Sequence, residues 1–111
     1  VYQGAAMVGG AEAVYLPAEP ENNFFPCLEE LSTDLLERTS IFFLCSPANP
    51  QGAVADKLYL KKLIELARES DFIGAFDECY CDLYRDEPPL GGLKVCAEFD
   101  LGVSNVLSFN S

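Results

Sequence analysis

The sequence predicts an α/β fold in three layers, α/β/α, around a mostly parallel sheet. Short apolar runs alternate with stretches of helical periodicity, and successive runs are spaced by about one crossover unit. A continuous apolar run suits a parallel strand that helices cover on both faces. The chain has 111 residues, half of them apolar, which is enough for one core but not for two. We therefore expect residues 1–111 to form a single partial domain.

The N-terminal third is predicted to contain two helices and one strand. Residues 1–9 form a short helix that two glycines end, and residues 11–17 form a strand that a proline stops. After a polar loop, Pro26 suits the first position of a helix over residues 26–39, because a helix leaves the N–H of that position without a partner. The leucines of this segment fall on one face.

The remaining elements alternate strand, helix and strand. Residues 40–45 (SIFFLC) are predicted to be a buried strand. Asp56 can cap a helix over residues 57–70, whose apolar side chains recur at i, i+3, i+4 and i+7 and should face the sheet. Residues 72–77 are the next buried strand, and a last strand lies within residues 104–111. A turn and a proline-rich loop with a helix entry separate these two strands.

The charge balance and the cysteines exclude several classes of function. Seven basic and eighteen acidic residues give a net charge of −11, which would repel a nucleic-acid backbone. Because we find neither a membrane-spanning apolar run nor a signal-peptide pattern, we expect a cytoplasmic protein. Five cysteines without histidine form no zinc pattern, so we expect free thiols and no metal site. A metal or redox role for Cys79 and Cys81 is the less favoured interpretation.

Polar side chains gather where the predicted strands end, which is where ligands bind in parallel α/β sheets. Residues 46–52 (SPANPQG) follow one strand, residues 77–84 follow the next, and Asn110 and Ser111 follow the last. Asn49 and Asp77 are 28 positions apart, about one crossover unit, so both can border one crevice.

Each of these residues also has an ordinary structural explanation. An asparagine before a proline is often a turn former, an aspartate can cap a short helix, and Tyr80 could be packing. Their joint occurrence at the strand ends favours a ligand site. An unrelated nucleotide-binding fold is less favoured, because the sequence contains neither GxGxxG nor a Walker motif.

The motif NPQG at residues 49–52, followed one crossover later by FDECY at residues 76–80, resembles the motif pair of the class I/II aminotransferases. These are fold-type I enzymes that use pyridoxal 5'-phosphate (PLP). The resemblance extends over almost the whole chain. Within this family, the chain most resembles the N-succinyldiaminopimelate aminotransferases of bacterial lysine biosynthesis. Four segments carry this resemblance: ENNFFPCLEEL, CSPANPQG, FDECYCDLY and DEPPLGGL.

The resemblance implies a PLP-dependent transferase fold, with this chain as the central part of the large, cofactor-binding domain. It implies amino-group transfer between an amino acid and a 2-oxo acid. It also implies four cofactor contacts. Asp77 would accept the proton-bearing pyridine nitrogen, Asn49 and Tyr80 would donate to the phenolic oxygen, and Ser111 would align with a phosphate ligand.

The resemblance also shows what this chain does not contain. The family's Schiff-base lysine would lie just beyond Ser111, and none of the four lysines present matches it: Lys57, Lys61, Lys62 and Lys94. The glycine-rich phosphate loop and the carboxylate-binding arginine are also absent, since Arg38, Arg68 and Arg85 match no motif. We therefore expect a fragment that is inactive alone, has no catalytic residue of its own and holds the phosphate poorly.

Two further expectations concern the chain as a unit. It begins with Val1 in what resembles the middle of a helix, so we expect it to start inside a larger protein. The alternative is a stand-alone, non-catalytic α/β binding or assembly module, which a natural stop codon after Ser111 would favour. Truncation would leave sheet edges and apolar helix faces open, and these surfaces predict a homo-oligomer.

Overall fold

The computed structural model describes residues 1–110. Its elements, in chain order, are the helix α1 (Tyr2–Val8), the 3-10 helices η1 (Pro20–Asn22) and η2 (Leu28–Glu30), α2 (Thr33–Arg38), β1 (Ile41–Cys45), α3 (Lys57–Glu69), β2 (Ile73–Asp77), α4 (Gly92–Glu98) and β3 (Val106–Phe109). No helix among these is long and apolar enough to cross a membrane.

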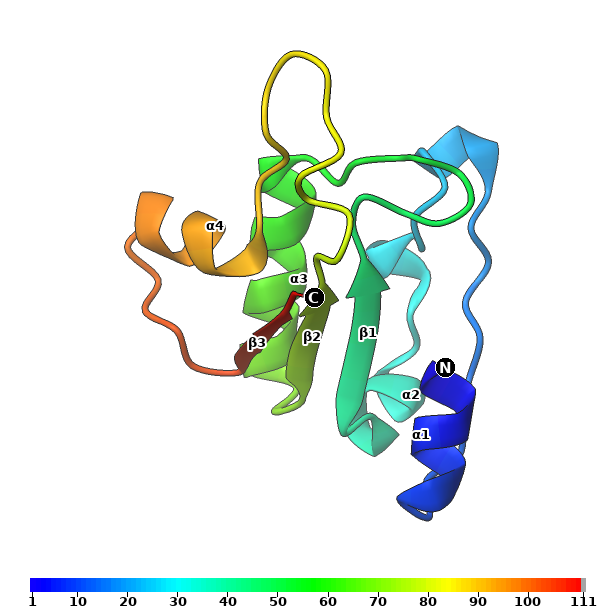
Figure 1. Cartoon of the computed structure of the whole chain (residues 1–111). Coiled ribbons are helices and arrows are strands. Elements are labelled where there is room, and N and C mark those ends of the chain that lie inside the picture. The colour runs from blue at the N-terminus through cyan, green and yellow to red at the C-terminus, as the bar shows by residue number, and fades with distance from the viewer. Residues whose placement is uncertain (111) are drawn as a thin grey trace.

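The three strands form one parallel sheet in the order β1-β2-β3. Ile41 lies opposite Ile73, and Gly74 lies opposite Val106. The helices α3 and α4 pack against the sheet and against each other, with α3 behind the strands in Figure 1. The predicted α/β fold with a parallel sheet is confirmed.

The core lies between the sheet and α3. Strand β1 contributes Phe42 and Leu44 to it, because alternate residues of a strand point to the same face. The helix α3 contributes four residues that are at most 1% exposed: Leu60, Leu63, Ile64 and Ala67. Their burial confirms the predicted apolar face, and each large side chain contributes about 1.5–3 kcal/mol. Asp56 caps the helix as predicted, since its Oδ1 accepts from the N–H of Tyr59 at 2.8 Å.

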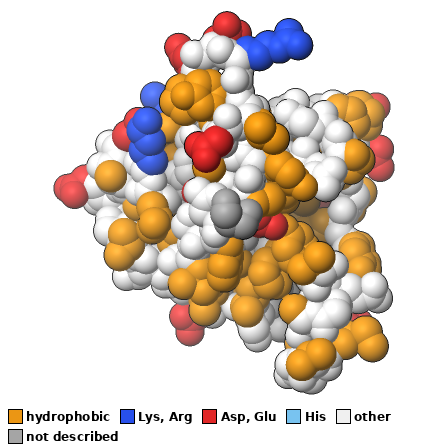
Figure 2. All heavy atoms as spheres, viewed as in Figure 1, with side chains coloured by type: hydrophobic (Ala, Val, Ile, Leu, Met, Phe, Trp, Pro, Cys, Tyr) orange, Lys and Arg blue, Asp and Glu red, His pale blue; other side chains and the backbone are white. Residues whose placement is uncertain are grey.

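The opposite face of the sheet is apolar and largely open. Four of the strand residues that point to it keep between 36% and 49% of their surface exposed: Ile41, Ile73, Leu107 and Phe109. Ala75 on the same face is 1% exposed. Hydrophobic side chains gather over the strands on this face in Figure 2. Helix α1 contacts it through Tyr2, whose ring stacks on Phe43 with the centroids 4.6 Å apart and the planes 5° from parallel.

Two predicted elements differ from the structure. The strand expected over residues 11–17 does not form, because no strand pairs with it and its side chains have no buried face: Val14 is 52% exposed and Tyr15 is 72% exposed. The helix expected over residues 26–39 is two short elements, η2 and α2. It is interrupted because Ser32 is extended and caps α2, its Oγ accepting from the N–H of Leu35.

Candidate functional site

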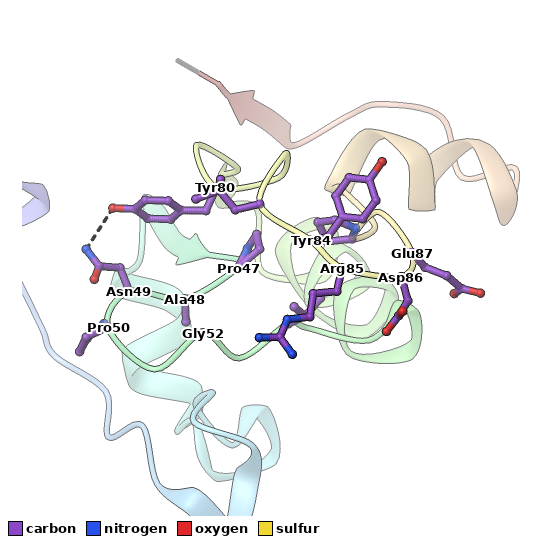
Figure 3. Close-up of a pocket in the computed structure, with 13 residues that line it drawn as sticks. Pro47, Ala48, Asn49, Pro50, Gly52, Tyr80, Tyr84, Arg85, Asp86 and Glu87 are labelled. Carbon is purple, nitrogen blue, oxygen red and sulfur yellow. Dashed lines mark hydrogen bonds between the residues drawn. The ribbon is translucent and has the colours of Figure 1, made fainter.

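Asn49 and Tyr80 meet at the carboxyl end of the sheet. Asn49 lies in the loop after β1 and Tyr80 in the turn after β2, and the amide Nδ2 of Asn49 donates to the Tyr80 hydroxyl oxygen at 3.1 Å. Figure 3 shows the two side chains pointing toward each other. The structure thus brings together two of the residues that the sequence singled out, although they are 31 positions apart.

The loop that presents Asn49 is held by backbone hydrogen bonds. Both of its prolyl bonds, Ser46–Pro47 and Asn49–Pro50, are cis. Ala48 donates to the carbonyl of Ala53 at 2.8 Å, and Gly52 donates to that of Ala48 at 2.7 Å. Gly52 has φ of +71°, a conformation that favours glycine. These two hydrogen bonds close the loop and so fix the position of Asn49.

A pocket of about 460 Å³ opens beside this pair, within the range typical of small-molecule sites. It lies between the loop after β1 and the segment that follows Tyr80. Its lining includes one cation, Arg85, together with Asp86 and Glu87 (Figure 3). Sequence reasoning did not select Arg85, because it matches no motif. Among the described residues, 1–110, neither a lysine nor Asp77 lines this pocket.

Asp77 ends β2 on the open face of the sheet, where Tyr2 reaches it. The Tyr2 hydroxyl donates to Oδ2 of Asp77 at 2.5 Å, and the N–H of Cys79 donates to Oδ1 at 3.3 Å. The hydrogen bond from Tyr2 is the main cause that holds the pKa of Asp77 below its ordinary value. Burial and the bond to Asp77 raise the pKa of Tyr2. Asp77 is therefore ionised at neutral pH and Tyr2 is protonated.

Tyr2 is another residue that the sequence did not point to. It stands in a helix that the sequence predicts, but no motif marks it, and 75 positions separate it from Asp77. Ser111, the predicted phosphate ligand, lies outside the described residues.

The comparison with known proteins decides the family. A family model described as aminotransferase class I and II matches residues 1–108. The chain belongs to the class I and II aminotransferase family. Members of this family depend on PLP, so the predicted family and its cofactor are confirmed.

Its relatives carry several names. The chain is 34% identical over 104 residues to the LL-diaminopimelate aminotransferase of Syntrophobacter fumaroxidans, a match that covers 93% of this chain and 27% of the relative. It is also 34% identical over 108 residues to the capreomycidine synthase of Streptomyces vinaceus, covering 97% of this chain and 26% of that protein. This chain thus spans about a quarter of the length of these relatives.

Solved structures of aminotransferases contain the same fold. An aminotransferase from Neisseria meningitidis superposes with a TM-score of 0.88 at 36% identity, covering 99% of this chain and 28% of that one. A probable N-succinyldiaminopimelate aminotransferase from Thermus thermophilus gives 0.84 at 24% identity, covering 99% of this chain and 28% of that one, and that likeness concerns the fold alone. The fold of this chain is therefore that of a region of the family's structure.

Proposed function

We propose that residues 1–111 are part of the large, cofactor-binding domain of a PLP-dependent aminotransferase and supply one side of its cofactor site. The observation that carries the proposal is the meeting of Asn49 and Tyr80 at the strand ends, beside the strand that Asp77 terminates. In this family, the bound cofactor supplies an electron sink for the carbanion that forms when an amino acid loses its α-proton.

Asp77 would hold a proton at the pyridine nitrogen. Its carboxylate is ionised at neutral pH, and the hydrogen bond from Tyr2 favours this charged form further by lowering the pKa of Asp77. A carboxylate that faces the nitrogen favours the protonated, cationic ring. Tyr2 occupies only Oδ2 in the structure, and each carboxylate oxygen has two acceptor positions, so Asp77 can accept a further N–H.

Asn49 and Tyr80 would bind the phenolic oxygen of the same ring. In the structure the amide of Asn49 donates to the oxygen of Tyr80, which leaves the Tyr80 hydroxyl proton available for another acceptor. A small rotation of Asn49 allows both groups to donate to one oxygen. Two donors favour its anionic form.

The cofactor's phosphate and the reacting lysine fit less well. Arg85 is the one cation among the described residues that line the pocket, and it stands next to two carboxylates. Lys61 lies over the ring of Phe99 and Lys62 pairs with Glu29, so both belong to the outer surface of α3. We therefore propose, as the sequence also predicted, that this chain alone does not transfer amino groups and binds the phosphate weakly, with Ser111 as a phosphate ligand.

We propose a diaminopimelate-type amino acid and a 2-oxo acid as substrates of the complete enzyme, in lysine biosynthesis and in the cytoplasm. The support is that relatives at 33–37% identity are named LL-diaminopimelate aminotransferases. The succinylated substrate that the sequence suggested rests on weaker similarity. Assays of the complete enzyme with free and N-succinylated LL-diaminopimelate would separate the two: faster turnover of the succinylated form would overturn the preference for the free one.

The cofactor contacts can be tested with pyridoxamine 5'-phosphate, which lacks the reactive aldehyde. Titration of the isotope-labelled chain, followed by amide chemical shifts, should move the resonances of Asn49, Asp77 and Tyr80. Asp77→Asn should weaken binding, whereas Asp82→Asn in the same segment should not. Shifts confined to other residues, or equal binding by both variants, would overturn the proposal.

The predicted inactivity needs a second experiment. After incubation with PLP and reduction with borohydride, intact mass should show no stoichiometric adduct on a single lysine. A single mapped adduct would mean that this chain carries a working site. The homo-oligomer that the open sheet face favours is checked by light scattering, where one monomeric mass across a wide concentration range would contradict it.

A further inference from the structure

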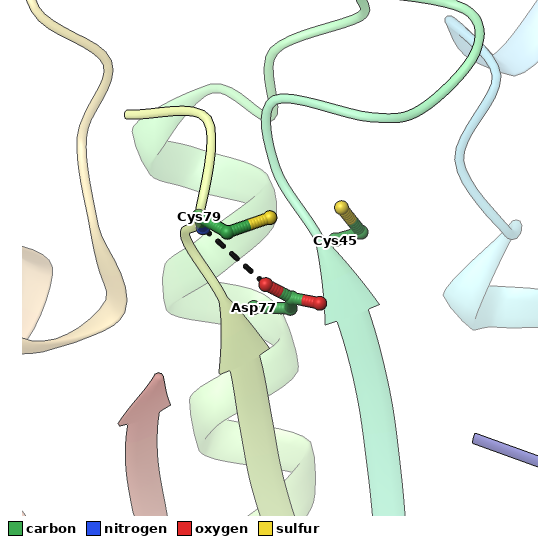
Figure 4. A group of neighbouring side chains, drawn as sticks. All are labelled: Cys45, Asp77 and Cys79. Carbon is green, nitrogen blue, oxygen red and sulfur yellow. Dashed lines mark hydrogen bonds between the residues drawn. The ribbon is translucent and has the colours of Figure 1, made fainter. Parts of the chain in front are cut away.

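Three potential metal ligands converge beside the proposed cofactor contacts. Cys45 ends β1, Asp77 ends β2, and Cys79 follows two positions later. Their ligand atoms, two thiol sulfurs and one carboxylate oxygen, all lie within 4.8 Å of one another. Figure 4 shows the three side chains facing a common point between the ends of the two strands.

The backbone explains why these side chains meet. Cys45 and Asp77 are register partners on neighbouring parallel strands, so their side chains leave the sheet on the same face. The turn after β2 brings Cys79 back over this point, because its N–H donates to Oδ1 of Asp77 at 3.3 Å. The group is thus placed by the sheet register and by one turn. The sequence did not reveal it, since the spacing between Cys45 and Cys79 matches no metal-binding pattern.

The ligand set has a chemical preference. Thiolates are soft ligands that select Zn²⁺ over Mg²⁺ or Ca²⁺, and a carboxylate is an accepted third ligand. Bond lengths of about 2.0–2.3 Å to a tetrahedral Zn²⁺ place ligand atoms roughly 3.3–3.8 Å apart. Small side-chain rotations would close the present separations to these values. Three protein ligands would leave the fourth position open to water.

The surroundings also suit a cation. All three residues are partly buried, and none of the ion pairs found among residues 1–110 involves Asp77. The Tyr2 hydroxyl donates to Oδ2 of Asp77 and would orient this carboxylate, as outer-shell donors do around metal ligands. Asp77 is thus the only formal negative charge of the group until the thiols lose their protons.

We infer that Cys45, Asp77 and Cys79 form a site for a thiophilic divalent cation such as Zn²⁺. Both thiols bind as thiolates, so each cation that enters releases about two protons to solvent. Because Asp77 belongs to both sites, a bound cation would compete with the pyridine nitrogen for its carboxylate. The site itself goes beyond the proposed function and does not depend on cofactor binding.

Co²⁺ is a suitable probe, because thiolate coordination gives an intense near-ultraviolet charge-transfer band. The reduced, metal-free chain is titrated with Co²⁺ without oxygen and without cofactor. We expect one equivalent to produce the band and Zn²⁺ to abolish it. Cys45→Ser and Cys79→Ser each remove one of the two thiolates, so each should bind Co²⁺ too weakly to give the band at one equivalent. Asp77→Asn replaces the third ligand and should weaken Co²⁺ binding at least as much as loss of an outer-shell partner does, roughly tenfold or more. Cys27→Ser, which removes a thiol outside the group, should bind as the wild type does.

A measurement on the wild-type chain avoids any question of variant folding. Thiol alkylation followed by peptide mass analysis should show that Zn²⁺ protects Cys45 and Cys79 but not Cys27 or Cys81. Absence of the Co²⁺ band, its persistence in both serine variants, or equal protection of all four thiols would overturn the site. Because no cofactor is present, a failure here leaves the proposed function untouched, and a failure to bind pyridoxamine phosphate leaves this site untouched.

Discussion

The Tyr2 hydroxyl and the Asp77 carboxylate form a 2.5 Å hydrogen bond between the first helix and the end of the central strand. The Tyr2 ring is already fixed by its stack on Phe43, so the hydroxyl needs little further ordering to reach Asp77. Together with the stack, this hydrogen bond joins α1 to the open face of the sheet, and it favours the ionised form of a residue that both proposed sites use.

Tyr2→Phe should lower the free energy of unfolding at pH 7 by about 1 kcal/mol, because it removes a hydrogen bond to a charged but partly exposed group. The phenylalanine keeps the stack on Phe43. Asp77 has a lowered pKa in the folded state, so the bond contributes above the ordinary value of 3.8 and is lost as the pH falls through the lowered pKa.

Urea denaturation at several pH values checks this. The difference in the free energy of unfolding between Tyr2→Phe and wild type should be largest at pH 7 and should become smaller in acid. Tyr15→Phe is the matched control, because Tyr15 is 72% exposed. A difference that does not change with pH would show that the effect comes from packing rather than from Asp77.

The contrast between two pairs shows how much of the site could be predicted. The contact of Asn49 with Tyr80 follows from a motif and one crossover, because both residues leave the ends of adjacent parallel strands. The contact of Tyr2 with Asp77 depends on where a short helix packs, which no local pattern specifies. The grouping of Cys45 with Asp77 likewise depends on the pairing register of two strands.

The same contrast between local pattern and long-range contact explains which elements of the fold could be predicted. The burial of α3 was predictable, since its period and its Asp56 cap are local properties of the sequence. The strand expected over residues 11–17 was not formed, because a strand also requires a partner for its backbone hydrogen bonds. Composition favours the extended conformation there, but only pairing would make it a strand.

Tyr59 should make the chain less stable in alkali. Its hydroxyl donates to the carbonyl of Pro26 at 2.8 Å, and burial raises its pKa, with smaller effects from Cys27 and Glu29. A raised pKa in the folded state gives stability that is complete below the unfolded value, about 10, and is lost as the pH rises above it. Tyr59→Phe should therefore cost about 1 kcal/mol at pH 7 and flatten the decline between pH 9 and about 11.

The check is urea denaturation across that alkaline range. The control Tyr15→Phe, at an exposed position, should leave the slope of unfolding free energy against pH unchanged. Tyr2 should contribute to this slope in both wild type and Tyr59→Phe, because its pKa is also raised. An equal slope in wild type and Tyr59→Phe would mean that Tyr59 is not linked to folding.

Glu78 should be important for stability although it follows the site aspartate directly. Its Oε1 accepts from the N–H of Gly92 at 2.7 Å and its Oε2 accepts from the hydroxyl of Ser108 at 2.8 Å, so one carboxylate joins the start of α4 to β3. Glu78→Ala should lower the free energy of unfolding by about 1–3 kcal/mol.

Thermal and urea denaturation measure this loss. Glu78→Gln keeps one acceptor oxygen and should recover part of it. Glu87→Ala, in the exposed loop between Tyr84 and α4, should remain within about 0.5 kcal/mol of wild type. If Glu78→Ala and Glu87→Ala cost the same, α4 is not held by the Glu78 carboxylate.

Two glycines in helices should respond to alanine in opposite directions. A Cβ on Gly92 would lie 2.7 Å from Cδ2 of Phe76, whose ring is 2% exposed and cannot move aside, so Gly92→Ala should cost about 1–3 kcal/mol. A Cβ on Gly4 meets nothing within 4 Å, and Gly4→Ala should stabilise α1 by about 0.5–1 kcal/mol. Urea denaturation of both variants gives the sign of each change in the free energy of unfolding. A neutral Gly92→Ala would require α4 to sit farther from Phe76 than the structure places it, which would also remove the geometry that lets Glu78 reach the N–H of Gly92.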